Sequence, residues 1–415
     1  MTNKLSALLG WIDARFPLTA LWKSQLAEYY APKNFNFWYY FGSLALLVLV
    51  MQIVTGIVLT MHYKPDSSLA FGSVEYIMRD VPWGWLIRYM HSVGASMFFV
   101  VVYLHMFRAM LYGSYRKPRE LLWIFGMLIY LCLMAEAFFG YLLPWGQMSF
   151  WGAQVIVNLF DAIPFVGPDL ALWIRGDYAI SDATLNRFFA FHVIAVPLML
   201  LALVAAHVIA LHEVGSNNPD GIEIKKHKDP KTGIPLDGIP FHPYYTVKDM
   251  LGVAAFLIVF AVIVFFIPEM GGYFLEKNNF IPANSLQTPT HIAPLWFFTP
   301  FYSILRANVF NFLWIPAKLW GVLSMAIAVV IYFFLPWLDR SPVKSIRYRG
   351  PIYKMALTLF VISFVTLGYL GTLPVDPLRT VLAQIGTVIY FLFFFLMPWY
   401  TRLDKTKPEP ERVRW

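Results

Sequence analysis

The chain has 415 residues, of which 59% are hydrophobic, 18% aromatic and only 13% charged. With apolar runs near 20 residues, this composition is typical of an integral membrane protein and excludes a disordered chain. The formal net charge of +8 is explained by an uneven distribution of Lys and Arg between loops, so we expect no nucleic-acid partner. The single cysteine, Cys132, excludes a disulfide framework and a thiolate metal site.

Residues 1–37 carry several charges and no uninterrupted apolar core. We therefore expect an interfacial arm rather than a cleaved signal peptide. Eight apolar segments follow, each long enough to cross a bilayer as a helix. They are predicted at 38–61, 85–111, 121–142, 188–211, 247–267, 317–337, 352–371 and 377–399. The predicted fold class is an all-α integral membrane protein with eight transmembrane helices.

The spans fall into two groups of four, a first region at 38–216 and a C-terminal region at 247–403, joined by a loop at 217–246. Each region contains one long outer connection, 143–187 and 268–316, too apolar to stay solvated, where we expect short amphipathic surface helices. Most Lys and Arg of the loops lie on the side of both termini, which predicts cytoplasmic termini. The tail 404–415 is expected to be mobile.

Four histidines lie in pairs inside two predicted spans. His91 and His105 are 14 residues apart, and His192 and His207 are 15 apart. On a helix each spacing covers roughly 21–23 Å, most of a bilayer core of about 30 Å. Two such helices facing each other would present two bis-imidazole sites at different depths, which suits haem and not tetrahedral zinc. The alternative is that each histidine only hydrogen-bonds to a neighbouring helix.

Two pairs of glycines repeat the 14-residue interval, Gly42 with Gly56 and Gly126 with Gly140. Small residues allow close approach, whether of a macrocycle edge or of another helix. Two arginines lie about one turn from a histidine, Arg88 before His91 and Arg108 after His105. Each could pair with a haem propionate or could be an interfacial arginine with its charged end in the head-group region.

Four stretches resemble, in family order, cytochrome b of the respiratory ubiquinol–cytochrome c reductase of the bacterial type. They are RYMHSVGASMFF (88–99), GYLLPWGQMSFWG (140–152), LHEVGSNNPDG (211–221) and FHPYYTVKDMLG (241–252). The resemblance covers nearly the whole chain. It implies that the first four spans form a dihaem four-helix bundle.

The resemblance also implies roles for individual residues. His91 and His192 would ligate a low-potential haem b near the outer face, and His105 and His207 a high-potential haem b near the cytoplasmic face. The glycines and arginines named above would clear room for the haems and pair with their propionates. The implied quinone-reducing site comprises His212, Ser216, Phe241, Lys248 and Asp249. The implied quinol-oxidising site comprises Tyr141, Gly152, Pro294, Leu295, Trp296, Phe297 and Tyr302.

The implied activity is oxidation of ubiquinol at the outer face, electron transfer through two haems b and reduction of ubiquinone at the cytoplasmic face, coupled to proton translocation. Such a catalytic subunit would have a Rieske iron–sulfur protein and a membrane-anchored cytochrome c as partners, in a homodimeric complex of the bacterial inner membrane. Two other readings stay open: a dihaem anchor of another oxidoreductase, and a secondary transporter, which would bind no haem.

The chain departs from the family pattern at two places. The outer-site motif, usually Pro-Glu-Trp-Tyr, reads PLWF at 294–297, and the leucine cannot accept a proton. We expect another acid to substitute, first Glu136, then Glu269 or Glu276, although Glu136 could instead bond within its bundle or near a haem.

The second departure is the 15-residue spacing, where the family more often has 14. Fifteen residues overshoot the starting helix face by about 60°. We predict a bulge or kink near Pro197 that absorbs the extra residue between His192 and His207.

Overall fold

The structure, a computed structural model, describes residues 2–311 and 313–414. Within these residues, eight helical segments are long and apolar enough to cross a membrane. They are Phe37–Thr60, Gly84–Tyr112, Glu120–Leu142, Asp182–Val214, Phe241–Phe266, Ala317–Leu338, Pro351–Gly371 and Pro377–Phe395. The all-α membrane fold is therefore confirmed, and all eight predicted spans are present.

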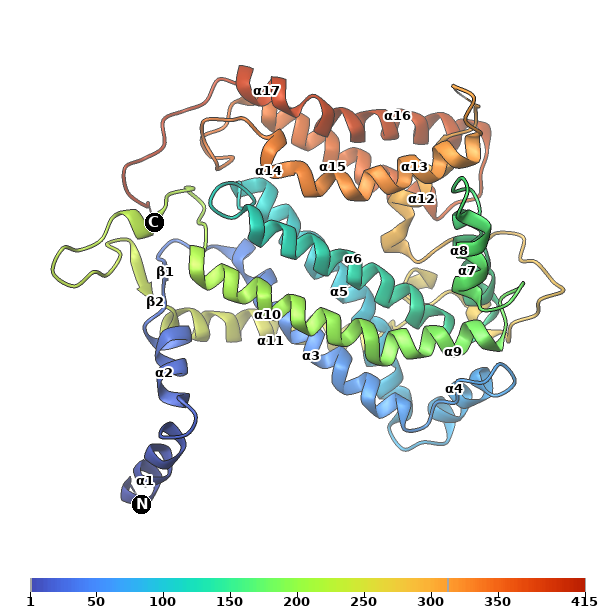
Figure 1. Cartoon of the computed structure of the whole chain (residues 1–415), viewed down its shortest axis with the longest axis horizontal. Helices are drawn as coiled ribbons and strands as arrows, with labels where there is room; N and C mark the ends of the chain where they lie inside the picture. The colour runs from blue at the N-terminus through green and yellow to red at the C-terminus, as the bar shows by residue number, and fades with distance from the viewer. Residues whose placement is uncertain (1, 312, 415) are drawn as a thin grey trace.

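The first four spans form two packed pairs of helices (Figure 1). Helix α3 packs on α5, and α6 packs on α10. The bounds are α3 Tyr40–Thr60 after η2 Phe37–Tyr39, α5 Gly84–Tyr112, α6 Glu120–Leu142, and α9 Asp182–Ala190, η3 Phe191–Ala195 and α10 Val196–Val214 in succession. Because α10 follows α9 and η3 without a break, the fourth span begins several residues earlier than predicted.

The C-terminal region begins with a span packed on the first pair, since α11 contacts both α3 and α5. The remaining helices pack around the short helix α12, which contacts α13, α15 and α16. The bounds are η5 Phe241–Tyr245, α11 Thr246–Phe266, α12 Thr299–Ala307, α13 Ala317–Val330, η9 Ile331–Phe334, α14 Leu335–Leu338, α15 Pro351–Gly371, α16 Pro377–Phe395 and α17 Met397–Leu403. One cluster of buried side chains joins both regions, with Phe99 of α5 stacked on Phe297 at 3.7 Å between ring centroids.

Short helices lie in the two long connections, as predicted, and one more follows the first span. They are α4 Ala70–Arg79, α7 Gln147–Phe160, α8 Gly167–Arg175, η6 Met270–Gly272, η7 Lys277–Phe280, η8 Trp296–Phe298 and α12, whose bounds are given above. Both chain ends lie at the opposite end of the spans from α7 and α8 (Figure 1). We call the end with α7 and α8 the outer end and the end with the termini the inner end.

A π-helical turn, η3 (Phe191–Ala195), contains His192 and ends just before Pro197. A π turn takes one more residue than an α turn at nearly the same rise. The predicted bulge near Pro197 is therefore confirmed, and it lies on the N-terminal side of the proline.

Two strands at the inner end were not predicted. Strand β1 (Tyr30–Pro32) pairs antiparallel with β2 (Gly238–Pro240), in the register Tyr30 to Pro240. The ladder joins the N-terminal arm to the 217–246 loop, which also contains η4 (Ile224–Lys226). The arm itself continues outward as α1 (Thr2–Asp13), α2 (Leu18–Trp22) and η1 (Lys23–Ala27), which project from the helical body (Figure 1).

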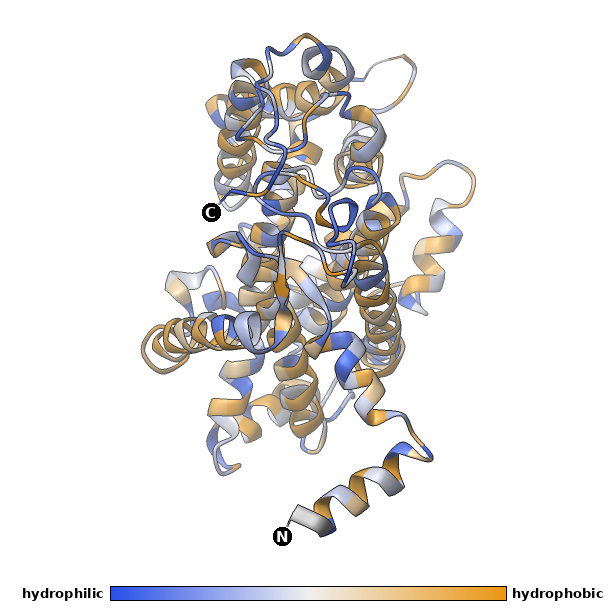
Figure 2. Ribbon diagram, turned by 90° about the vertical axis from the view of Figure 1, so that its left-hand side faces the viewer, coloured by the Kyte–Doolittle hydropathy of each residue, from blue (hydrophilic) through white to orange (hydrophobic). Residues whose placement is uncertain are grey.

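The expectation of a mobile C-terminal tail is wrong for residues 404–414. Arg412 donates to both carboxylate oxygens of Asp237, at 2.6 and 3.0 Å, and Asp237 is buried and also pairs with Lys33 at 3.0 Å. Val413 is buried, and the backbone N–H of Arg414 donates to Asp220. The tail is held because it provides a counter-charge for buried Asp237 and a backbone donor for buried Asp220, contacts that local sequence does not reveal. Figure 2 shows hydrophilic residues concentrated in these connecting segments and hydrophobic residues along the helices.

Candidate functional site

The four histidines lie in two pairs between α5 and the fourth span. The ring centroids of His91 and His192 are 6.1 Å apart, and those of His105 and His207 are 6.4 Å apart. With metal–imidazole bonds of about 2.0–2.1 Å, two rings that share one metal ion have centroids about 6 Å apart. The structure thus brings together both predicted pairs, at the separation that one bridging iron requires.

Each predicted glycine faces one of these histidines. A Cβ atom at Gly42, Gly56 or Gly126 would lie 3.3 Å from the Cε1 atom of a histidine ring, His105, His91 and His207 respectively. A Cβ atom at Gly140 would lie closer still to His192. The glycines are thus on the helices packed behind the histidines, and they leave room for the imidazole rings themselves. This packing role was not predicted, because the interval alone does not show which group approaches.

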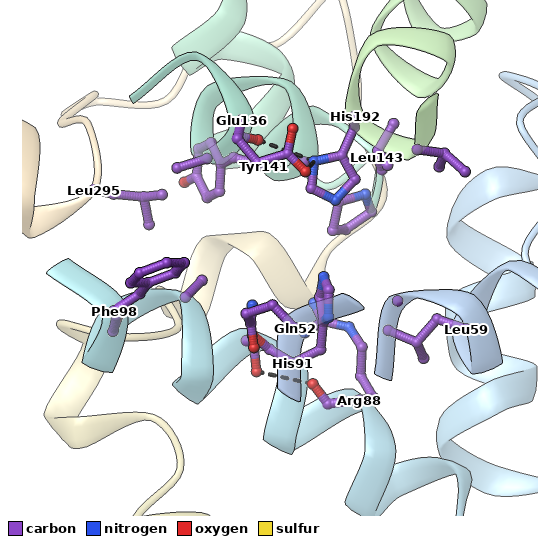
Figure 3. A pocket seen from close by; sticks show the side chains of 18 of the residues that line it. Gln52, Leu59, Arg88, His91, Phe98, Glu136, Tyr141, Leu143, His192 and Leu295 are labelled. Carbon is purple, nitrogen blue, oxygen red and sulfur yellow. Dashed lines mark hydrogen bonds and ion pairs between the residues drawn. The ribbon is translucent and has the colours of Figure 1, made fainter. Parts of the chain in front are cut away.

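Neighbouring groups orient the outer pair of rings. The His91 Nδ1 atom lies 2.9 Å from the Thr55 hydroxyl, and the His192 Nδ1 atom lies 3.0 Å from the Glu136 carbonyl oxygen. Such bonds from the remote nitrogen leave the other nitrogen free to bind a metal ion. Figure 3 shows His91 and His192 in one pocket, with Arg88 beside His91.

At the inner pair, Arg108 lies over the Tyr39 ring at 4.8 Å and within 3.4 Å of His105 Nδ1. Its Nε atom is buried without a hydrogen-bond partner, as is Nδ1 of His207. An unpaired buried guanidinium nitrogen is costly unless an anion completes it. Paired imidazoles, glycine clearances and the unpaired Nε atom of Arg108 together fit a flat, bis-ligated, anionic group such as haem.

A cavity of about 260 Å³ surrounds the outer pair and extends to the quinol-oxidising residues predicted from the family motif. Tyr141, Leu295 and Phe297 line it, together with Glu136 and Glu276. The Tyr141 hydroxyl donates to the Glu276 carboxylate. Burial raises the pKa of Glu276 to about 7, against the opposing effect of that hydrogen bond.

The three candidate acids therefore differ in surroundings. Glu136, our first candidate, has its carboxylate 3.0 Å from Nδ1 of His192, which is the contact near a predicted haem ligand that we named as its alternative role. Glu276 lies in the cavity with Leu295 and Tyr141. Glu269 does not line either described cavity.

Three of the other predicted outer-site residues lie around a second cavity of about 870 Å³, within the range of ligand pockets. Gly152, Pro294 and Tyr302 line it, among mostly apolar side chains. Trp296 instead packs on Phe274 and donates to the Ser96 hydroxyl at 3.2 Å. The motif residues 294–297 thus stand between the two cavities, with Leu295 facing the outer histidine pair.

The predicted quinone-reducing residues form two groups at the inner end. His212, Ser216 and Phe241 meet around Tyr29, which was not predicted. Lys248 donates to the Phe35 carbonyl, and Asp249 lies beside Ser43. No sequence signal pointed to Tyr29, because it lies in the polar arm, far from the recognised stretches.

A helical membrane protein with eight spans and two pairs of histidines between its helices has the architecture of a membrane-bound cytochrome. The comparisons with known proteins agree. The family models described as Cytochrome b/b6/petB and Cytochrome b(C-terminal)/b6/petD match residues 26–215 and 282–391. Cytochrome b of Allochromatium vinosum is 64% identical, over 100% of both chains.

Two further relatives extend the comparison. The Cytochrome b/c1 protein of Bradyrhizobium diazoefficiens is 46% identical over 98% of this chain and 56% of that longer protein. A solved structure of a hyperthermophilic respiratory Complex III contains a chain with a TM-score of 0.86 and 40% identity, covering 95% of this chain and 99% of that one. The chain belongs to the cytochrome b family, in its bacterial respiratory form.

Proposed function

We propose that this chain is the catalytic cytochrome b subunit of a quinol–cytochrome c reductase and that it holds two haems b, one in each histidine pair. The observation that carries the proposal is the pair of centroid separations, 6.1 and 6.4 Å, each with a glycine clearance behind both rings. Haem bound there would supply reversible one-electron transfer. Two such sites at different depths make an electron path across the membrane.

The chain's own residues would perform the remaining tasks. The outer cavities would bind a quinol. At the inner end, the group with His212 and the group with Asp249 would together bind a quinone and deliver protons from the cytoplasm. An electron moving inward against the membrane potential climbs about 2.3 kcal/mol per 100 mV, so the redox drop between quinol and acceptor must supply that energy. Separate outer and inner sites make this transfer part of proton translocation.

The partners follow from the relatives. The Complex III match and the cytochrome b/c1 relative support a Rieske iron–sulfur protein and a membrane-anchored cytochrome c as partners. We propose a homodimeric complex in the bacterial inner membrane with ubiquinone as substrate. The proposed cytoplasmic location of both termini is supported by their common position at the lysine- and arginine-rich end.

We assign proton acceptance at the outer site to Glu276, in place of the glutamate that the family motif has at position 295. Three observations support it. Its carboxylate shares a cavity with Leu295, receives a hydrogen bond from Tyr141, and has a pKa raised by burial to about 7. A base with a pKa near the working pH is the best suited to take a proton.

The haem content is tested by optical redox titration with pyridine haemochrome quantification of the purified complex. We expect two b haems per chain with separated potentials. His105→Leu should remove only the component assigned to the inner pair, and His91→Leu only the outer one, with protein yield compared in both. A wild-type content of one haem, or loss of the same component in both variants, would contradict the proposal.

A further inference from the structure

Tyr29 contacts three residues of the proposed quinone-reducing site. Its ring lies flat on the His212 imidazole, with centroids 4.3 Å apart and an interplanar angle of 6°. Its hydroxyl lies 3.3 Å from the Ser216 hydroxyl, and its ring is 6.1 Å from that of Phe241.

The backbone fixes this position. Tyr29 comes directly before β1, and Phe241 comes directly after β2. The Phe241 N–H donates to the Tyr29 carbonyl oxygen at 2.8 Å, which extends the two-stranded ladder to this pair. At the other end of the ladder, Asp237 comes directly before β2 and pairs with Lys33 and Arg412. Tyr29 is therefore fixed at the end of the ladder by a backbone hydrogen bond and is not on a free arm.

Stacking leaves the edge of the His212 ring available. The contact with Tyr29 uses the ring face, whereas hydrogen bonds are made at the ring edge. The Nδ1 atom of His212 is buried and has no hydrogen-bond partner, so a ligand that completes it is expected. The Tyr29 ring thus fixes the imidazole plane while that nitrogen stays free for a quinone carbonyl.

The Tyr29 hydroxyl also influences which hydrogen bonds Ser216 can make. Burial raises the pKa of Tyr29, against the opposing hydrogen bond with Ser216, so the phenol stays protonated and can donate. A serine hydroxyl that accepts from Tyr29 turns its own hydrogen elsewhere. Ser216 then remains a donor for a second quinone oxygen.

We propose that Tyr29 is a substrate-positioning residue of the inner quinone site, with its ring fixing the His212 plane and its hydroxyl orienting Ser216. This inference rests on the proposed quinone-reducing function of His212 and Ser216. Tyr29 takes no part in electron or proton transfer itself. It lowers the cost of binding by holding both hydrogen-bonding groups in place before the quinone arrives.

The test uses the whole purified complex with its b haems reduced, and follows their reoxidation by decylubiquinone in a stopped-flow spectrometer. Tyr29→Phe keeps the stacked ring and loses the hydroxyl. We expect the half-saturating quinone concentration to rise about fivefold, the value of one hydrogen bond of about 1 kcal/mol, with an unchanged limiting rate. Tyr29→Leu loses both groups, and its limiting rate should also fall and change its pH profile.

The matched controls are Tyr30→Phe and Tyr30→Leu, because Tyr30 is the next residue of the chain and begins β1, and successive side chains of an extended strand point to opposite faces. Both should match wild type. The proposal is overturned if the Tyr29 and Tyr30 variants behave alike, or if Tyr29→Phe lowers the half-saturating concentration, which would show that Tyr29 competes with quinone. Ser216→Ala tests the proposed inner site separately from the role of Tyr29. If this variant leaves reoxidation unchanged, the proposed inner site is wrong and the inference falls with it.

Discussion

Glu276→Gln keeps a side-chain oxygen that can accept the hydrogen bond from Tyr141, but the amide cannot take up or release a proton. The Glu276 pKa of about 7 makes about half of the carboxyls ionised at pH 7 and about one in ten at pH 6. If the ionised form accepts the quinol proton, wild-type quinol oxidation should fall about fivefold from pH 7 to pH 6. Glu276→Gln should lose this dependence and about 100-fold in rate, the typical contribution of a general base.

The assay is quinol–cytochrome c reduction by the purified complex from pH 5.5 to 9. Glu269→Gln is the matched control, because Glu269 lies in the same outer connection and outside both cavities. Glu136→Gln should change the spectrum of the outer haem, since Glu136 contacts His192. It should keep the fall in the rate of quinol oxidation below pH 7. A Glu276→Gln enzyme that keeps wild-type rate and pH profile would refute the reasoning.

Four further substitutions test the packing around the histidines and the tail. Gly140→Ala leaves no room for the His192 ring and should lower haem per chain by about half. Gly126→Ala should lose less, because its Cβ would lie 3.3 Å from Cε1 of His207. Thr55→Val removes the acceptor for His91 Nδ1 and should raise the potential of the outer haem in a redox titration, because the ligand becomes less basic. Arg412→Gln should free the tail and accelerate amide exchange in β2, measured by hydrogen–deuterium exchange; unchanged exchange would contradict the assigned clamp.

Features with a local period could be predicted from the sequence. Apolar runs near 20 residues gave all eight spans because a bilayer has a fixed thickness. The 14- and 15-residue histidine spacings gave the two pairs because a helix returns to one face at known intervals. The glycine interval pointed to the right residues, although it did not show that an imidazole ring occupies the space.

Features that depend on long-range contacts could not be predicted from the sequence. Strands β1 and β2 have three residues each and join positions about 200 residues apart, so no local pattern indicates them or Tyr29 beside them. The tail has a composition typical of a mobile segment, yet Arg412 is held by the buried carboxylate of Asp237. The order of the candidate acids rested on depth in a span, which favoured Glu136. The fold places both Glu136 and Glu276 at the cavity with Leu295, and only the fold shows that Glu136 contacts His192 and Glu276 contacts Tyr141.

The extra residue between His192 and His207 shows how the ligand geometry tolerates a change in spacing. An unbroken α-helix would rotate one ring about 60° past its partner's face. Pro197 has no N–H, so the carbonyl one turn before it already lacks its usual donor, and widening that turn costs less there than elsewhere. The π turn at Phe191–Ala195 takes up the residue immediately before this point, beside His192 itself. The two pairs therefore keep nearly equal ring separations, 6.1 and 6.4 Å, despite unequal spacing in the sequence.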